Sequence, residues 1–352
     1  MTIELKKRNP LPTWQFALLP ILAVALAFVL SALFIRAAGA RVFEAWGQII
    51  QGALGSRFAF LETLIKMTPL CLTGLAVTVA FRAEFWNIGT EGQLYAGAMA
   101  AALLGILPLG LPRFLHILLM ILGGFAAGGL WALIPGLLKV KYKVDDVVMT
   151  IMMNYIVLYV MNAILDTVWR DPNSGWPHSP EIMEIARYPR LLARSRFHLG
   201  FLIAVAAALL VHVLIRYMKL GFRMRAVGHN SRAADFAGVN VTRTVTAVAF
   251  ISGGIAGIAG VGEVAGMQYF LVEGLSHGYG YYGVAIAMLA GLEPLGVLIS
   301  SFFFAVIITG SQVMSRSTGV PVYLSDILQG ITLITMMVSM LLNRYRIVVK
   351  RG

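Results

Sequence analysis

A polar segment interrupted by glycines separates two long apolar runs in the first third of the chain. Residues 81–93 read FRAEFWNIGTEGQ and include the charged residues Arg82 and Glu91 together with helix-breaking Gly89 and Gly92. Charged groups and irregular backbone inside a bilayer are costly unless they are buried in protein or line an aqueous route. The segment therefore predicts a broken helix near the interior of a membrane protein, and this arrangement points to transport.

The apolar runs determine the fold class. Hydrophobic residues make up 59% of the chain and charged residues 12%, and the mean hydropathy is +0.81; soluble domains have about a quarter charged residues. A helical span needs about 20 apolar residues. We expect an all-α, polytopic integral membrane protein in which residues 1–352 form one transmembrane domain. About ten membrane segments are predicted, over residues 14–35, 59–80, 93–111, 114–138, 147–168, 198–215, 245–265, 280–292, 297–314 and 324–342. The run 280–292 is too short to cross alone, so it is a broken or re-entrant helix, or it begins earlier.

The positions of Lys and Arg predict the orientation of these segments. Basic residues favour the cytoplasmic side of a membrane, and they cluster in residues 1–13 and 216–244. We therefore expect both termini in the cytoplasm, with 1–13 as a tail, 216–244 as a cytoplasmic loop and 169–197 as a long extracytoplasmic loop. The net charge of +12 indicates contact with anionic membrane lipid or a cytoplasmic partner. No nucleic-acid partner is expected, because the basic residues are spread among loops that flank the membrane.

Sequence patterns typical of enzymes and metal sites give no positive signal. The chain has no P-loop motif, and the G-x-G-x-x-G match at 278–283 lacks the βαβ surroundings of a dinucleotide site. Cys71 is the only cysteine, which excludes an intrachain disulfide and a Cys-rich metal site. The six histidines are scattered, and His212 fits a hydrogen-bonded structural role better than a ligand role. We expect no catalytic site, cofactor or metal.

Glycines spaced four apart occur within three apolar segments. The pairs are Gly124 and Gly128, Gly253 and Gly257, and Gly262 and Gly266. In lipid, small residues on one helical face allow two backbones to approach closely. We expect these pairs to pack helices within the chain rather than to encode a dimer.

The predicted cytoplasmic loop contains a short helix. Asn230 or Ser231 is a suitable N-cap and Gly238 a suitable C-cap. Ala233, Ala234 and Ala237 are expected to form one small-residue face, beside the aromatic Phe236. A short helix with a small apolar face has little to bury by itself, so it is suited to dock into a groove of a partner. The alternative is an amphipathic loop that rests on lipid headgroups.

At these residues the chain resembles the permease subunits of ATP-binding-cassette importers. It is similar to the ribose and branched-chain amino-acid permease superfamily, and most similar to the longer permease subunit of bacterial general nucleoside importers, over about residues 55–345. The matching patterns are Ala233-Ala234-x-x-x-Gly238, Thr68-Pro69-Leu70, Gly74-Leu-Ala76, Phe81-Arg82-Ala83, Asn87-Ile-Gly89-x-Glu91-Gly92-Gln93, Lys219-x-Gly221, Arg225-Ala-Val-Gly228 and Pro294-Leu-Gly296. The family usually has Gly-Leu-Phe before the asparagine, whereas this chain has Glu84-Phe85-Trp86.

The resemblance implies a non-enzymatic subunit in a bacterial cytoplasmic (inner) membrane. Its partners would be two ATP-binding-cassette ATPase subunits, a second related permease subunit and an extracytoplasmic substrate-binding protein. The implied substrate is a nucleoside, and the alternative within the class is ribose or another simple sugar. A secondary transporter or channel is a further alternative, disfavoured because carboxylates that could couple an ion gradient are scarce in the apolar runs. A membrane-embedded enzyme lacks a recognisable catalytic constellation.

Three groups of candidate site residues follow. The substrate-pathway candidates are Trp86, Asn87, Thr90, Glu91 and Gln93. The resemblance implies ATPase contacts for Arg225, Arg232, Ala233, Ala234, Phe236 and Gly238, and binding-protein docking for Arg190 and Arg194. An indole can stack on a planar ring, and amides can pair with hydroxyls or base edges. The alternatives are that Glu91 caps a helix, that Trp86 anchors at the interface, and that the arginines of 169–197 only meet lipid phosphates.

Overall fold

The computed structural model describes residues 2–7, 13–39, 41–172, 174–318, 321 and 323–350. It consists of two compact units, residues 1–63 with 303–352 and residues 64–302, and each is described by itself below. The fold is helical, as the composition predicts. Within the described residues, six helices are long and apolar enough to cross a membrane, or seven if one sharply bent pair forms a single span.

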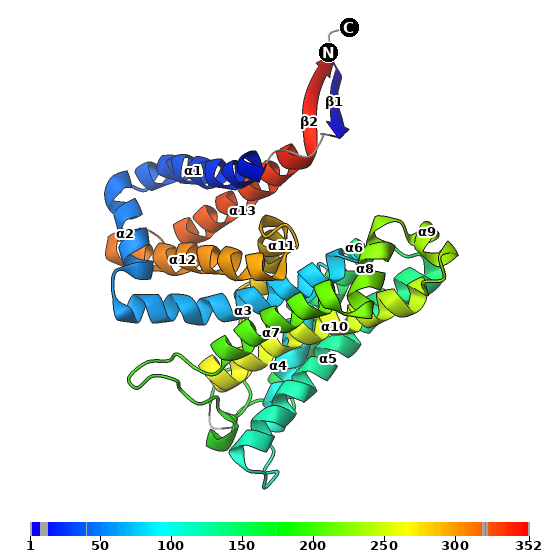
Figure 1. The fold of residues 1–352 in the computed structure, drawn as a ribbon. Coiled ribbons are helices and arrows are strands. Elements are labelled where there is room, and N and C mark those ends of the chain that lie inside the picture. Colours follow the sequence, from blue (N-terminus) through cyan, green and yellow to red (C-terminus); the bar gives the residue numbers. More distant parts are fainter. Residues whose placement is uncertain are drawn as a thin grey trace. The chain divides into compact units, whose positions relative to one another are not determined.

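The larger unit contains the central helices of the chain. Its elements are the main part of α3 (Arg57–Phe81), α4 (Thr90–Ile106), α5 (Arg113–Tyr142), α6 (Asp146–Asp166), η1 (Glu184–Ala186), α7 (Gly200–Tyr217), α8 (Lys219–His229), α9 (Ser231–Phe236), α10 (Val241–Gly262), the π-helix η2 (Glu263–Gln268), α11 (Tyr279–Leu289) and the first part of α12 (Pro294–Thr318). Helices α4, α5 and α10 lie side by side and pack most extensively (Figure 1).

Glycines allow α5 and α10 to approach each other closely. A Cβ atom on Gly257 would collide with the carbonyl oxygen of Gly124, and one on Gly253 would collide with that of Gly128. Both pairs therefore pack helices within the chain, as predicted. The pair at 262 and 266 behaves differently, because Gly262 has open space where a side chain would lie and Gly266 packs against the ring of His198.

The close crossing of α5 and α10 leaves no room for a side chain at Gly257. Replacing Gly257 with alanine forces the two backbones apart, so we expect it to lower the free energy of unfolding by about 2 kcal/mol, in the range for overpacking. Gly262→Ala on the same helix is the matched control, since nothing lies within 4 Å of its added methyl group. Thermal unfolding of both purified variants measures the difference. Equal melting temperatures would contradict the close-packing argument.

Each of the ten apolar runs contains a helix, but the number of crossings is not confirmed. The runs 93–111 and 280–292 correspond to α4 and α11, which have 17 and 11 residues. At about 1.5 Å per residue these helices are about 26 Å and about 17 Å long, shorter than the roughly 30 Å hydrocarbon core. Helix α11 is thus too short to cross alone, in agreement with the prediction for its run.

The smaller unit contains both ends of the described chain. It consists of β1 (Thr2–Lys7), α1 (Thr13–Ala37), α2 (Val42–Leu54), the start of α3, the end of α12, α13 (Tyr323–Arg344) and β2 (Tyr345–Lys350). Ala25–Ala37 and Val42–Leu54 meet at a bend of 118°. Their buried residues Ile35 and Ile49 share a core with Met314 of α12. Strand β1 pairs antiparallel with β2, so the two ends of the chain lie together.

Candidate functional site

The polar joint of residues 82–89, between α3 and α4, is tied together by buried amides. Asn87 and Gln93 exchange two hydrogen bonds, at 2.9 and 2.8 Å. Asn87 Nδ2 also donates to Ser252 Oγ of α10 at 2.9 Å, and that hydroxyl donates to the carbonyl of Ala76 in α3 at 2.7 Å. Three helices therefore meet at one side chain of the joint. A non-helical polar joint between the two apolar runs is present, and it connects α3 to α4 as two separate helices.

Glu91 connects the first turn of α4 to the start of α11. Its side chain is 4% exposed, and Oε2 accepts hydrogen bonds from Ser276 Oγ and from the backbone N–H of Gly280, both at 2.8 Å. Thr90 Oγ1 donates to the carbonyl of Gly280 at 2.9 Å. The N-cap position of α4 is occupied by Gly89, without a side-chain cap bond. The carboxylate of Glu91 thus holds two segments together and does not cap its own helix.

Trp86 is the exposed member of the predicted substrate-pathway group. Its side chain is 39% exposed, whereas Asn87, Thr90, Glu91 and Gln93 are all buried. The indole packs edge-on against Phe81, with ring centroids 4.6 Å apart. The structure therefore buries four of the five candidates in two hydrogen-bonded groups, Asn87 with Gln93 and Thr90 with Glu91, and leaves Trp86 exposed.

A lysine that the sequence analysis did not identify holds the joint to the α5–α6 turn. Lys139 Nζ forms an ion pair with Asp146 Oδ2 at 2.5 Å and donates to the carbonyl of Glu84. The same carboxylate oxygen accepts the backbone N–H of Trp86 at 2.6 Å. The sequence did contain a signal for this pair. Lys139 and Asp146 carry opposite charges and stand at the two ends of the gap between the apolar runs 114–138 and 147–168.

The short helix α9 is capped largely as the sequence predicts. Asn230 Oδ1 accepts the backbone N–H of Ala233 at 3.0 Å, so Asn230 rather than Ser231 is the N-cap. After the C-cap residue Ala237, Gly238 adopts a left-handed φ of +83°. The N–H of Val239 then donates to the carbonyl of Ala234 at 2.9 Å. This is the glycine-terminated helix end that Gly238 was expected to supply.

The expected small-residue face of α9 is divided between two environments. Ala234 is 5% exposed and packs in a core that includes Val227 and Val245, whereas Ala233 and Ala237 are exposed. The expectation that Ala234 belongs to an outward face with its neighbours is therefore wrong. Successive helical residues point about 100° apart, so Ala234 can face the bundle while Ala233 and Ala237 face outward. Phe236, at 97% exposed, is the prominent outward side chain.

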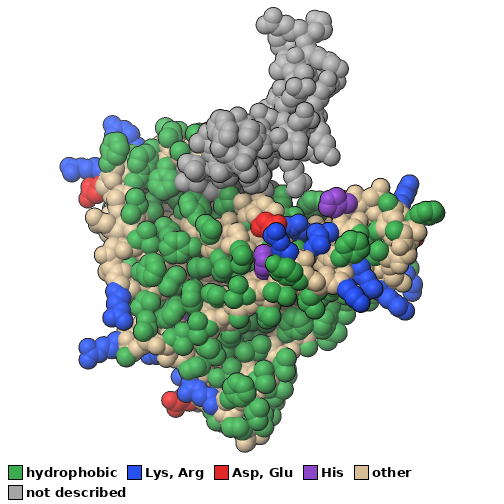
Figure 2. All heavy atoms as spheres, viewed as in Figure 1, with side chains coloured by type: hydrophobic (Ala, Val, Ile, Leu, Met, Phe, Trp, Pro, Cys, Tyr) green, Lys and Arg blue, Asp and Glu red, His purple; other side chains and the backbone are tan. Residues whose placement is uncertain are grey.

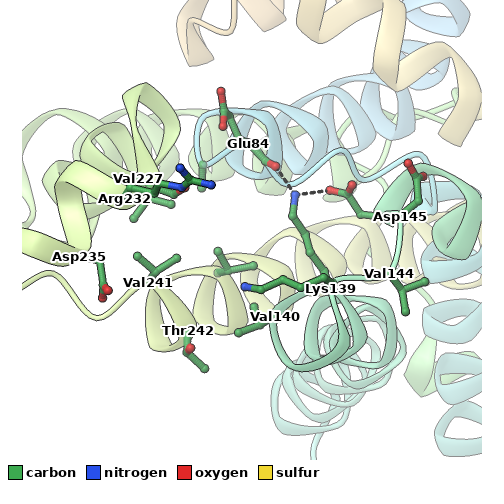
Figure 3. A pocket seen from close by; sticks show the side chains of 15 residues that line it. Glu84, Lys139, Val140, Val144, Asp145, Val227, Arg232, Asp235, Val241 and Thr242 are labelled. Atoms are coloured by element: carbon green, nitrogen blue, oxygen red, sulfur yellow. Dashed lines mark hydrogen bonds and ion pairs between the residues drawn. The ribbon is translucent and has the colours of Figure 1, made fainter.

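A pocket of about 550 Å³ lies between α9 and the joint. Arg232 and Asp235 of α9 line one side of it, and Glu84, Lys139 and Asp145 line the other (Figure 3). Acidic and basic groups are interleaved around this pocket, so it suits a polar partner of mixed charge. The predicted ATPase candidate Arg225 lies elsewhere, because its guanidinium donates to the carbonyl of Ile215 in α7.

The predicted extracytoplasmic loop is packed against the bundle along much of its length. The backbone N–H groups of Ser179, Ile182 and Tyr188 donate to carbonyls of residues 271, 269 and 265, at 2.9, 2.8 and 2.8 Å. The loop thus runs antiparallel to the segment that follows α10. Arg190 and Arg194 are both exposed, so they remain available for contact with another molecule.

Two titratable side chains are buried at the end of this loop. His198 and Tyr188 are each 3% exposed, with ring centroids 5.9 Å apart. Burial lowers the pKa of His198 to about 4 and raises the pKa of the Tyr188 phenol. The N–H of Gly200 donates to His198 Nδ1 at 3.1 Å, and His198 Nε2 has no hydrogen-bond partner within the described residues. The imidazole is therefore held neutral, with its proton on Nε2.

The depressed pKa predicts a loss of stability in mild acid. Because the folded state resists protonation of His198 and the unfolded state does not, stability is retained above about pH 6.5 and falls as the pH drops toward 4. A shift of this size lowers the free energy of unfolding by about 3 kcal/mol once the pH has fallen to about 4. We expect His198→Gln to lose less stability than the parent chain between pH 7 and pH 4 in chemical unfolding. Parallel pH profiles for the two chains would refute the assignment.

Comparisons with known proteins agree with the helical architecture. Residues 59–337 match the family model described as branched-chain amino acid transport system / permease component. The guanosine ABC transporter permease protein NupP of Bacillus subtilis (strain 168) is 35% identical over 90% of this chain and 92% of its own length. The nucleoside ABC transporter permease protein NupB of Lactococcus lactis subsp. cremoris (strain MG1363) is 31% identical over 86% of both chains. The glucose ABC transporter permease protein TsgB13 of Haloferax volcanii is 29% identical over 98% of this chain and 93% of its own.

Proposed function

We propose that this chain, which belongs to the family of permease components of branched-chain amino acid transport systems, is the permease subunit of an ATP-driven importer of nucleosides. The observation that carries the substrate class is the full-length similarity to permeases named for guanosine and nucleosides. The chain is a multi-pass, non-catalytic membrane subunit, and ATP hydrolysis belongs to partner ATPases. The membrane is the bacterial cytoplasmic (inner) membrane.

Partner subunits complete the transporter. Two ATPase subunits bind on the cytoplasmic side, one of them at α9 of this chain, a second related permease subunit completes the pathway, and an extracytoplasmic binding protein delivers the substrate. The exposed Phe236, Arg232 and Ala233 offer an aromatic anchor with an adjacent charge to the ATPase cleft. Aromatic and Arg side chains carry much of the binding energy at protein interfaces. Ala234 supports this surface from behind, because it fixes α9 to the bundle.

Movement of α9 reaches the joint through packed contacts. Ala234 belongs to the same core as Phe81 and Phe85, which flank the start of the joint. On the other side of the pocket, Lys139 holds the carbonyl of Glu84. Rearrangement of α9 on ATP-driven closure of the ATPase pair thus shifts the joint and changes the access of the pathway.

The substrate passes the exposed face of the joint. Trp86 offers an aromatic surface for a nucleobase. The buried Asn87, Thr90, Glu91 and Gln93 keep the backbone beside Trp86 in place through their hydrogen bonds. Guanosine uptake by the Trp86→Ala and Trp86→Phe variants of the assembled importer tests this role. Weak uptake with alanine and recovery with phenylalanine is the expected result, and equal uptake by both variants and the parent would leave Trp86 an interface anchor.

A transport assay tests the proposed function as a whole. The purified importer, with its ATPases and binding protein, is reconstituted in vesicles and supplied with labelled guanosine, ribose or glucose. We expect ATP-dependent uptake of guanosine that neither sugar inhibits. Uptake of ribose or glucose alone would favour the second candidate, a simple-sugar importer, which the similarity to the glucose permease supports. Uptake that follows an ion gradient without ATP would overturn both.

The exposed arginines of residues 169–197 are proposed to dock the binding protein. Complementary charges chiefly raise the rate of encounter, and salt screens them. We expect Arg190→Glu with Arg194→Glu to slow binding-protein-dependent uptake several-fold at low salt and much less at high salt. ATPase assembly serves as the internal control and should not change. If uptake at low salt equals that of the parent importer, these arginines only face solvent or lipid phosphates.

A further inference from the structure

A second pocket lies at the end of α7 that adjoins α8, away from α9. Its volume is about 360 Å³, and four of its lining side chains are Arg82, His212, Arg216 and Arg225. They come from the residue after α3, from the last turns of α7 and from α8. Segments far apart in the sequence thus bring three guanidinium groups to one cavity, and its one acidic lining residue is Glu293.

Two of the three guanidinium groups are held in place. Arg82 forms an ion pair with Glu293 and donates from Nε and one terminal nitrogen to the carbonyl of Leu292, at 3.1 and 3.0 Å. Arg225 donates to the carbonyl of Ile215. A guanidinium carries five N–H donors in a fixed fork, so each group has more donors than these bonds require. Arg216 is exposed at the rim. The cavity therefore presents an excess of positive charge and oriented donors.

Large exposed hydrophobic side chains adjoin this pocket in the sequence. Tyr217, Met218 and Phe222 are 74%, 52% and 62% exposed, and they surround the junction between α7 and α8. Basic side chains, with acidic and histidine groups beside them, form a cluster on a face that is otherwise largely hydrophobic (Figure 2). Exposed aromatic and thioether groups next to arginines are typical of the boundary between lipid headgroups and acyl chains.

We propose that this pocket binds the phosphate of an anionic phospholipid from the cytoplasmic leaflet. Arginine recognises phosphate through paired N–H donors, and basic pockets between membrane helices bind lipid headgroups. Arg216 contacts the phosphate from the rim, and Arg82 and Arg225 contact it from within the cavity. Tyr217 and Phe222 lie against the acyl chains. Arg82 is the first residue of the joint, but the described lining residues include neither Trp86 nor any residue of α9 or of the pocket beside it, so the proposal goes beyond the proposed function.

Native mass spectrometry of the assembled importer, titrated with phosphatidylglycerol, tests this site. Each basic residue near an anionic lipid contributes about 1 kcal/mol, so Arg216→Gln should weaken the binding about fivefold. Arg223→Gln is the matched control, because Arg223 is also exposed on α8 but does not line the pocket. We expect that variant to bind nearly as the parent does. Phosphatidylcholine has the same phosphate beside a cationic choline, so it should bind more weakly than phosphatidylglycerol.

Three results would overturn the proposal. Equal weakening by the two substitutions would mean a diffuse basic surface rather than a site. Inorganic phosphate that displaces phosphatidylglycerol with the same dependence on Arg216 would identify a free-anion site. If Arg216→Gln releases the ATPases and leaves lipid binding unchanged, a protein partner occupies the pocket. None of these results depends on which solute the importer carries, so the lipid site and the proposed substrate class can fail independently.

Discussion

Replacing Phe236 with alanine is expected to reduce ATP-driven uptake at least tenfold, on the order of a 1.4 kcal/mol loss at the ATPase interface. Phe236 is 97% exposed on a six-residue helix whose inward residue, Ala234, is already fixed to the bundle. Truncating an aromatic anchor at the centre of an interface commonly costs about 2 kcal/mol or more. The side chain makes little contribution to the fold of its own chain, so membrane insertion and thermal stability should not change. Uptake and ATPase copurification, measured on the same preparation, give the result.

Phe114 supplies the matched control for that experiment. It is 75% exposed, and it lies in the first turn of α5, whereas the residues of α5 that line the pocket beside α9 are in its last turn. Phe114→Ala removes the same kind of ring from the end of α5 that lies away from the pocket, so the variant should transport normally. If Phe236→Ala retained full uptake and its ATPases, α9 would not be the docking element. Loss of uptake in both variants would indicate a general effect of removing surface aromatics.

Replacing Glu91 with alanine is expected to lower the free energy of unfolding by about 4 kcal/mol. The substitution leaves the hydroxyl of Ser276 and the backbone N–H of Gly280 without their acceptor in a buried site. Each buried donor left unsatisfied costs about 1–3 kcal/mol, and the removed side-chain atoms leave a cavity. The start of α11 then loses its bonds to Glu91 and keeps the hydrogen bond from Thr90 to the carbonyl of Gly280. Chemical unfolding of the purified chain, followed by circular dichroism, measures the change.

Glu91→Gln separates this role from one that needs the negative charge. The amide retains one acceptor oxygen at the same distance from the backbone, so it should recover more than half of the stability lost in Glu91→Ala. Glu184→Ala, in an exposed position of the loop of residues 169–197, should have little effect. If the alanine variant at 91 were as stable as the parent chain, the buried network would not support the fold. A glutamine variant as unstable as the alanine variant would instead assign the effect to charge.

Local features of the fold were predictable from the sequence because they depend on neighbouring residues. Apolar runs of sufficient length must become helices in lipid, where every backbone polar group needs an internal partner. The break at the joint follows from its glycines and charges, and the ends of α9 follow from the preferences of Asn230 and Gly238. Helix α2 was missed because its apolar residues are interrupted by polar ones, as at Glu44 and Gln48.

The contacts that organise the candidate site were not predictable, since most join residues far apart in the chain. Glu91 and Ser276 are separated by 185 positions, and no sequence periodicity specifies that pair. The burial of Ala234 depends on which side of α9 lies on Val245. The packing of residues 179–188 along 265–271 depends on backbone hydrogen bonds, which leave no trace in the side-chain pattern. The role of the joint as a junction of three helices therefore emerged only from the structure.

The loop of residues 169–197 also determines where a reporter group can be attached to this chain. Between Ser179 and Tyr188 the backbone is committed to hydrogen bonds with the segment after α10, so an inserted epitope there would displace the loop. Beyond that stretch the chain turns at Arg194, which is exposed and has a left-handed φ of +59°. A short tag placed at this turn leaves the paired backbone intact and projects outward. Antibody access to such a tag in intact cells would establish which side of the membrane the loop occupies.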